Sequence, residues 1–227
     1  MKLPEIQTPL YSLNLPSNGK KIEYRPFLVK EEKLLLITNE SRDNKEIINS
    51  IKQLIEACTF NKLNVDNITS YDLEYIFLKL RAKSVGEKSD LMFTCSQSGE
   101  SFQVTVNLDE IEPTSSGEVS NMIKINEDIS IKLRPLRVKD MAIIDEENSS
   151  LAVSRMIETI YEGEKEYDTS DATDEELLEF VNNFSLNVLD EVTKYAESMP
   201  KLVYERTVKS PAGYDNLIKL EGVQDFF

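Results

Sequence analysis

The 227-residue sequence contains no histidine and no tryptophan. Without histidine the chain lacks the commonest general base and the commonest metal ligand among side chains. It also cannot form the Ser-His or Cys-His pairs that activate a nucleophile. This absence excludes most hydrolase mechanisms.

Cysteine is scarce as well, because Cys58 and Cys95 are the only two. Two unclustered cysteines in a folded chain of this size are typical of a reducing compartment, so we expect no structural disulfide. Four-ligand zinc is excluded by residue count, since its ligands are drawn mainly from cysteine and histidine. We therefore expect no bound metal and no cofactor.

Glycine and long apolar runs are also in short supply. Seven glycines leave little material for a phosphate-cradling loop, and neither glycine pattern of such loops occurs. No apolar run approaches the ~18–20 residues that span a bilayer, and residues 1–5 lack the apolar segment of a signal peptide. We expect no small-molecule substrate, no membrane partner and no secretion by that route.

Basic charge is the minority sign. Lys and Arg number 26 against 41 Asp and Glu, giving a net charge of −15, and no basic run appears. A phosphate backbone would meet net repulsion, so no nucleic-acid partner is expected. The acid groups 146–147 and 174–176 lie at predicted helix ends, where solvated carboxylates are a simpler explanation than catalysis. The sequence therefore predicts a protein that is not an enzyme.

Periodic hydrophobicity is what the chain does contain. Hydrophobic residues make up 40% and charged residues 30%, which fits a folded globular protein. Residues 11–24 alternate about a Pro-Ser-Asn-Gly turn at 16–19, and residues 91–108 alternate about a Ser-Gln-Ser-Gly turn at 96–99. Both segments predict β-hairpins.

Two amphipathic helices are predicted between these hairpins. The first has Asp43 and Glu46 at capping-box spacing, and its apolar stripe extends to Cys58. The second begins near Thr69 or Ser70. Cys58 is thus expected to be a small core residue rather than a reactive thiol.

The second half of the chain starts with another predicted hairpin, at residues 123–133. Four helices are predicted to follow. The third of them begins at a capping box formed by Thr173 and Glu176. The four segments are 138–148, 149–160, 173–184 and 188–199.

A short internal repeat links the two halves. Ile22–Lys30 and Ile131–Lys139 share Ile, Arg, Pro, Val and Lys at a constant offset of 109 residues (131 − 22 and 139 − 30). A hairpin also closes each half, so both halves are expected to contain a hairpin, an Arg-Pro turn, helices and a hairpin.

This order predicts an α+β fold of two duplicated units, each with small antiparallel hairpins packed against amphipathic helices. The expected boundaries are 1–112 for the N-terminal unit, 113–120 for a linker and 121–227 for the C-terminal unit. A single irregular domain is the alternative.

The turn that begins at Cys95 resembles half of a zinc-ribbon knuckle. Ser98 occupies the position where a Cys-x-x-Cys pair would have its second sulfur, and the later turn at 209–212 has no sulfur. The hairpins are therefore expected to be zinc-ribbon-like but degenerate, and to be held by packing alone.

The Arg-Pro turns are the best sequence candidates for a structurally decisive or interface site. Proline fixes the exit of the strand, while arginine can bind carbonyl groups or an acidic neighbour. The candidate residues are Arg25, Pro26 and Phe27 in the first copy and Arg134 and Pro135 in the second. The alternative is that both arginines make only intrachain contacts.

The last eleven residues form a second candidate. Residues 217–227 contain six large apolar side chains and end in Phe226 and Phe227. Leaving two phenylalanines in water would forgo roughly 1.5–3 kcal/mol each, so a surface should cover them. Either the chain's own last hairpin or a partner subunit could supply that surface.

Several segments resemble one known family. They are KIEYRPFLVKEEKLLL at 21–36, YDLEYIFL at 71–78, LRAKSVG at 80–86 and LEGVQDFF at 220–227. The sequence resembles the baseplate hub assembly proteins of T-even-type contractile-tail bacteriophages, most strongly in its N-terminal third. Hairpins of that family often contain Cys-x-x-Cys pairs, from which this chain departs at Ser98 and 210–212.

The resemblance implies a non-enzymatic structural or assembly protein of the baseplate hub that binds other baseplate or hub proteins. It implies synthesis in the host cytoplasm and action there during assembly, or residence in the tail baseplate of the virion. Two alternatives remain: a protein-binding adaptor or assembly chaperone of another system, and an enzyme with an unrecognised carboxylate site.

Overall fold

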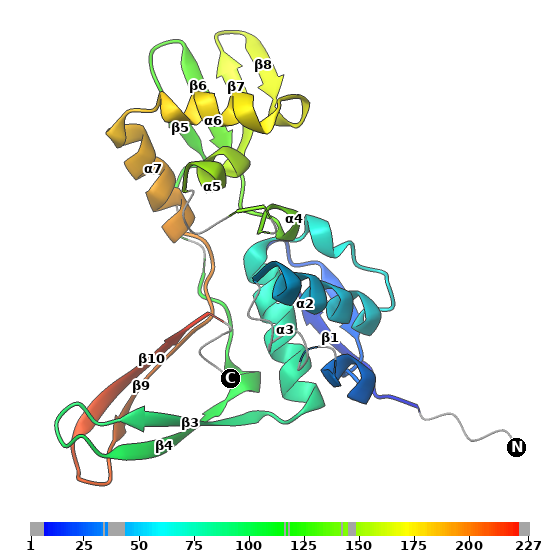
Figure 1. Ribbon diagram of the computed structural model, residues 1–227, viewed down its shortest axis with the longest axis vertical. Helices are drawn as coiled ribbons and strands as arrows, with labels where there is room; N and C mark the ends of the chain where they lie inside the picture. The colour runs from blue at the N-terminus through cyan, green and yellow to red at the C-terminus, as the bar shows by residue number, and fades with distance from the viewer. Residues whose placement is uncertain are drawn as a thin grey trace, which may run out of the picture. The chain divides into compact units, whose positions relative to one another are not determined.

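The computed structural model describes residues 7–33, 35, 44–115, 117, 119–141, 143–144 and 149–222 (Figure 1). A helix begins at residue 29. The further helices are α2 (Asn44–Cys58), α3 (Ser70–Ser84), α4 (Val138–Met141), α5 (Ser149–Met156), α6 (Asp174–Asn182) and α7 (Leu186–Glu197), with 3-10 turns η1 (Val65–Asn67), η2 (Leu108–Glu110) and η3 (Thr169–Asp171). The strands are β1 (Tyr11–Asn14), β2 (Lys21–Tyr24), β3 (Lys88–Thr94), β4 (Ser101–Asn107), β5 (Met122–Lys124), β6 (Ile129–Leu133), β7 (Ile157–Glu162), β8 (Lys165–Asp168), β9 (Val203–Lys209) and β10 (Asp215–Glu221).

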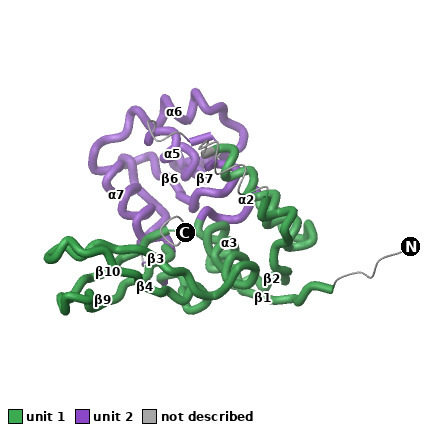
Figure 2. Tube along the Cα trace, turned by 60° about the horizontal axis from the view of Figure 1, so that its bottom comes forward, with its two compact units in different colours: residues 1–65, 71–114, 201–227 green, residues 66–70, 115–200 purple. Residues whose placement is uncertain are grey.

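Contacts divide the chain into two compact units (Figure 2). Unit 1 comprises residues 1–65, 71–114 and 201–227, and unit 2 comprises residues 66–70 and 115–200. Small antiparallel sheets combined with helices confirm the predicted α+β class.

Unit 1 is organised around α3. Most residues of this helix are buried, which is typical of a helix surrounded by the rest of its unit. The β1–β2 hairpin is attached near both ends of α3, because the Ser17 backbone N–H donates to Asp72 and the Phe27 backbone N–H donates to Ser84. Cys58, at the end of α2, is fully buried, which confirms its predicted place in the core.

Two further hairpins of unit 1, β3–β4 and β9–β10, each bury one face. Alternate residues of β4 and β10 are buried, as expected of strands with one covered side. At one end the hairpins are tied together by a bridge between Pro113 and Leu202. Their turns lie side by side at the other end (Figure 1), where Ser210 hydrogen-bonds Cys95.

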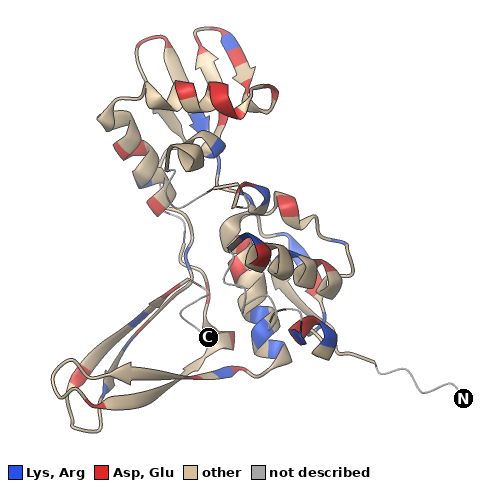
Figure 3. Cartoon of the chain, viewed as in Figure 1, with Lys and Arg blue, Asp and Glu red and all other residues tan. Residues whose placement is uncertain are grey.

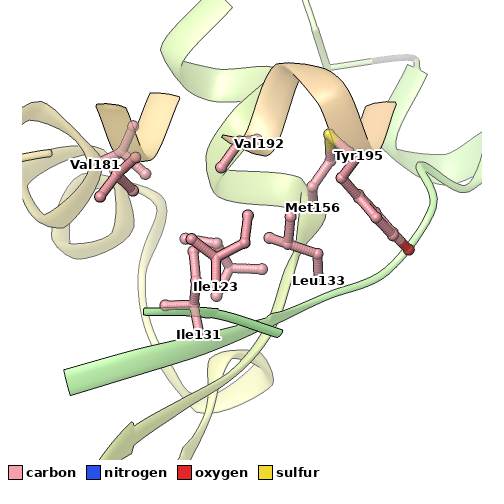
Figure 4. Close-up of a cluster of buried hydrophobic side chains, with 9 residues drawn as sticks. Ile123, Ile131, Leu133, Met156, Val181, Val192 and Tyr195 are labelled. Atoms are coloured by element: carbon pink, nitrogen blue, oxygen red, sulfur yellow. The ribbon is translucent and has the colours of Figure 1, made fainter. Parts of the chain in front are cut away.

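Unit 2 contains a four-stranded antiparallel sheet in the order β5-β6-β7-β8. Its core is a cluster of nine buried apolar residues from the sheet and the helices α5, α6 and α7 (Figure 4). The members are Ile123, Ile131, Leu133, Met156, Ile157, Val181, Val188, Val192 and Tyr195. The predicted capping box of Thr173 and Glu176 is present at the start of α6.

The helix predicted over residues 149–160 is wrong in its second part. Helix α5 ends at Met156, and Ile157–Glu162 forms β7, which pairs with β6 on one side and β8 on the other. The segment Ile-Glu-Thr-Ile-Tyr at 157–161 is rich in β-branched and aromatic residues, which favour a strand once a neighbouring strand is available. The acidic residues that follow β7 in the sequence form β8 and η3.

The division into units also differs from the expected boundaries. The last hairpin, 201–227, belongs with the N-terminal residues rather than with 121–200. Backbone pairing joins the start of this hairpin to the N-terminal residues: the Thr114 N–H donates to the Lys201 carbonyl, and Pro113 forms a bridge with Leu202. The chain therefore leaves unit 1 and returns to it along paired segments.

Candidate functional site

The first Arg-Pro turn forms a closed network of intrachain bonds. One guanidinium nitrogen of Arg25 donates to the Pro26 carbonyl at 2.9 Å, and the other donates to Glu31 at 3.0 Å. The second carboxylate oxygen of Glu31 accepts the Leu28 backbone N–H at 2.7 Å. Glu31 thus fastens the start of the helix at residue 29 to the end of β2.

Burial and hydrogen bonding compete at Glu31. Burial alone would raise the pKa of its carboxyl group. The hydrogen bonds from Arg25 and the Leu28 N–H, together with the charge of Arg25, outweigh that effect and hold the pKa below its ordinary value. The ionised form is therefore the one that the fold stabilises.

The second Arg-Pro turn repeats the same bonds. Arg134 donates to the Pro135 carbonyl at 3.1 Å and to the two carboxylate oxygens of Asp140 at 2.7 and 3.3 Å. The Arg137 backbone N–H donates to Asp140 at 2.8 Å. The side chain of Asp140 is only 1% exposed, compared with 7% for Glu31.

The two networks correspond residue for residue at an offset of 109 residues, since 140 − 31 and 134 − 25 give the same value. Each arginine backbone N–H is also used by a helix end, the first donating to Cys58 and the second to Met156. Phe27 is buried, with 9% of its surface exposed. The arrangement is one that fixes a strand exit to a helix start.

Sequence reasoning named the arginines and prolines but missed Glu31 and Asp140. The detectable signal is an acid six residues after each arginine, at the same offset as the repeat itself. Identity between the two copies ends at Lys30 and Lys139, one residue before each acid, and the acids themselves differ in type.

The turn of the β3–β4 hairpin gathers hydrogen-bond donors around one sulfur. Cys95 is 1% exposed, and its Sγ accepts from the hydroxyl and backbone N–H of Ser98, the N–H of Gln97 and the hydroxyl of Ser210. These donors, led by the Ser98 hydroxyl, lower the pKa of Cys95 to about 6, although burial opposes them. By contrast, burial raises the pKa of Cys58 to about 11.

The two hairpin turns differ by one residue. Six residues, 95–100, separate the pair Thr94 and Ser101, whereas five residues, 210–214, separate Lys209 and Asp215. The shorter turn lacks a counterpart of Ser98. Within the residues that the structure describes, no group of three or more His, Cys, Asp or Glu side chains could hold a metal ion.

The C-terminal candidate is only partly visible. Ile218 and Leu220 are buried in β10, while Leu217 is 64% exposed. Phe226 and Phe227 lie outside the described residues, as do Asp43 of the expected capping box and the acid pair 146–147.

Acidic residues concentrate in one segment of unit 2 (Figure 3). Residues 162–179, from the end of β7 through β8 and η3 into α6, contain nine acids and one lysine. Asp174, Glu175 and Glu176 occupy the first turn of α6, where the helix dipole favours negative charge.

The side chains of the two Arg-Pro turns bind backbone groups of the same chain, so the site is a structural one. No helix among the described residues combines the length and apolar character needed to cross a membrane. The family model of T4 bacteriophage base plate proteins matches residues 8–227, so the chain belongs to this family and is a phage baseplate structural protein. No curated protein and no solved structure matches the chain.

Proposed function

We propose that the chain is a non-enzymatic component or assembly factor of the baseplate hub and acts by binding other hub proteins. The observation that carries the proposal is the family match over residues 8–227. The chemistry of the chain supports it, because a sequence without histidine has few routes to general-base or nucleophilic catalysis.

The Arg-Pro turns contribute to this function as internal structural elements. The side chains of Arg25 and Arg134 are 12% and 15% exposed, and their guanidinium groups are held by the chain's own carboxylates. An arginine satisfied in this way has few free donors for a partner. We therefore assign binding to other surfaces of the chain. The role of the Arg-Pro turns is to keep those surfaces rigid.

Phe226 and Phe227 are proposed as one binding element. Aromatic side chains that fill a partner's pocket are frequent energetic centres of interfaces. Deleting residues 225–227 should leave the thermal stability of the isolated chain unchanged and reduce its recovery with hub proteins. A loss of stability would instead assign these residues to the core, and no change in either quantity would remove them from the proposal.

The whole proposal is tested by producing the hub proteins of the same phage individually and measuring their binding to the purified chain. We expect binding to at least one of them, with no dependence on added zinc. Quantifying the chain in finished tails by mass spectrometry then separates the two roles, since a resident subunit remains and an assembly factor does not. Binding to none of the hub proteins would contradict the proposal.

A further inference from the structure

The turn after α2 holds an exposed phenylalanine in a backbone conformation that usually requires glycine. Phe60 has a φ of +59° and Asn61 a φ of +56°. The left-handed region is tolerated by glycine and, less well, by asparagine, but it is strained for a bulky L-residue. Phe60 is nevertheless 43% exposed.

The hydrogen bonds identify this turn as a Schellman motif. The Asn61 N–H donates to the Glu56 carbonyl at 2.8 Å, and the Phe60 N–H donates to the Ala57 carbonyl at 3.4 Å. Phe60 is thus at the position directly after the helix cap, where glycine is the usual residue. Helix α2 ends in a defined way despite the unfavourable side chain.

Glycine use elsewhere in the chain makes the choice of phenylalanine informative. Of the seven glycines, six have a positive φ. Nearly every glycine is therefore placed where its conformational freedom is needed. Position 60 needs the same freedom but is occupied by phenylalanine. The free protein gains neither a relaxed backbone nor a buried ring at this position.

The surrounding hydrogen bonds fix the backbone of the turn that carries the Phe60 ring. Thr59, which is 1% exposed, donates its hydroxyl to the Ile55 carbonyl at 2.7 Å. On the other side, the Arg25 N–H donates to the Cys58 carbonyl at 3.0 Å. A ring displayed on so rigid a turn loses little freedom on binding, which is a property of good interface anchors.

Lys62 adds a charge beside the ring. Its Nζ lies 5.8 Å from the centroid of Phe60, and the residue is exposed. Among the described residues it has no ion-pair partner within 4.0 Å. An aromatic ring next to an unpaired lysine complements an apolar pocket with a carboxylate at its rim.

We propose that Phe60 is an anchor by which the chain docks onto another baseplate protein, in an apolar pocket whose rim presents an acidic side chain to Lys62. The inference rests on the proposed function, because the occupant is a neighbouring protein of the same baseplate. It assigns that binding to a specific turn of unit 1.

The test uses Phe60→Asn, in which the new side chain accepts the left-handed backbone. Relief of strain should raise the Tm of the isolated chain by about 2–4 °C. Loss of the ring should weaken binding to the purified hub protein by about 30-fold or more, as expected of an interface hot spot. Phe60→Tyr keeps both ring and strain, so it should retain wild-type Tm and binding.

Leu186→Ala is the matched control, because Leu186 is 83% exposed and lies in unit 2. It should leave binding unchanged. A Tm that falls by several degrees in Phe60→Asn would show that the ring supports the fold and would overturn the inference. Wild-type binding by Phe60→Asn would also overturn it while leaving the proposed function intact, whereas binding to no hub protein by the wild-type chain would defeat both.

Discussion

The two halves of the chain agree in one repeated element, the Arg-Pro turn, and diverge later, at the ends of α2 and α5. Both Arg-Pro turns use an acid six residues later to bind the arginine and the backbone N–H of the residue just before the next helix. The first half later reverses at Phe60, at the end of α2, while the second half continues from Met156 directly into β7. The repeated bonds are local, whereas the divergence depends on which strands are available as neighbours.

Burial differs between the copies as well. Asp140 is more deeply buried than Glu31, and Val138 is 1% exposed where its counterpart Val29 is 66% exposed. The same bonds are therefore less exposed to solvent in the second half. Because a buried charge that loses its partner is strongly destabilising, the two copies should respond unequally to the same type of substitution.

The largest loss of stability is expected from Asp140→Asn. This change removes the charge that compensates Arg134, and breaking a buried pair in this way costs about 3 kcal/mol or more. Thermal unfolding should show a Tm lower by roughly 6–12 °C. As a control, Asp190→Asn disrupts a solvent-exposed pair with Lys194 and should leave the Tm unchanged. A small effect of Asp140→Asn would contradict the structural role of this element.

Glu31→Gln should lower the free energy of unfolding by a smaller amount, about 1–2 kcal/mol. Glu31 is less buried than Asp140, and the glutamine amide still accepts a hydrogen bond. Urea unfolding of the two variants side by side measures the difference. If Glu31→Gln costs more stability than Asp140→Asn, the comparison of burial between the two halves is wrong.

The same variant gives a pH-dependent signature. Since the pKa of Glu31 is lower in the folded chain than its ordinary value of 4.5, its contribution is complete above that value and is lost as the pH falls through the native pKa. The stability gap between wild type and Glu31→Gln should therefore be constant near pH 7 and shrink below about pH 4.5. A gap that widens in acid would reverse the assigned direction.

These elements also show how far sequence reasoning reaches. Alternating residues and turn residues sufficed for the hairpins 11–24 and 91–108, because a hairpin is encoded by its own residues. The end of α5 was missed because Val153, Met156, Ile157 and Ile160 fit a helical stripe, and only pairing with β6 makes residues 157–162 a strand. The return of residues 201–227 to unit 1 depends on pairing across 87 residues, which no local pattern records.

The candidate site was predictable from the sequence only in part, because local patterns reveal its residues but not their packing. Arg25 and Arg134 stood out through a repeat, and an acidic partner was among the contacts expected of them. Which acid it is, and how deeply it is buried, depend on the packing around each copy. Phe60 left no sequence signal, because only the observed φ shows that a phenylalanine occupies a glycine position.

The closing hairpins allow a weaker test of the comparison between halves. Cys95 has a pKa of about 6 and Cys58 a pKa of about 11, so thiolate absorbance at 240 nm should titrate as a single group between pH 4 and 8.5. Ser98→Ala should raise the Cys95 pKa more than Ser210→Ala, since the hydroxyl of Ser98 is the larger influence. Equal titration of both cysteines would contradict the assigned surroundings of these thiols.

The smallest expected effect is that of metal removal. Cys58 and Cys95 cannot supply four ligands, and Cys95 is already surrounded by hydrogen-bond donors from both hairpin turns. EDTA should leave the Tm unchanged, and elemental analysis should find no stoichiometric zinc. One tightly bound zinc per chain, held by this chain alone, would overturn the prediction of a degenerate knuckle.

The central claim, that the chain serves the baseplate hub by binding proteins, is tested most directly by hub assembly from purified components. Assembly is measured by sedimentation with the wild-type chain, without it, and with the correctly folded Phe60→Asn variant. The account predicts complete hub complexes only when the wild-type chain is present. Hub complexes that form at the same rate and yield in all three mixtures would contradict it.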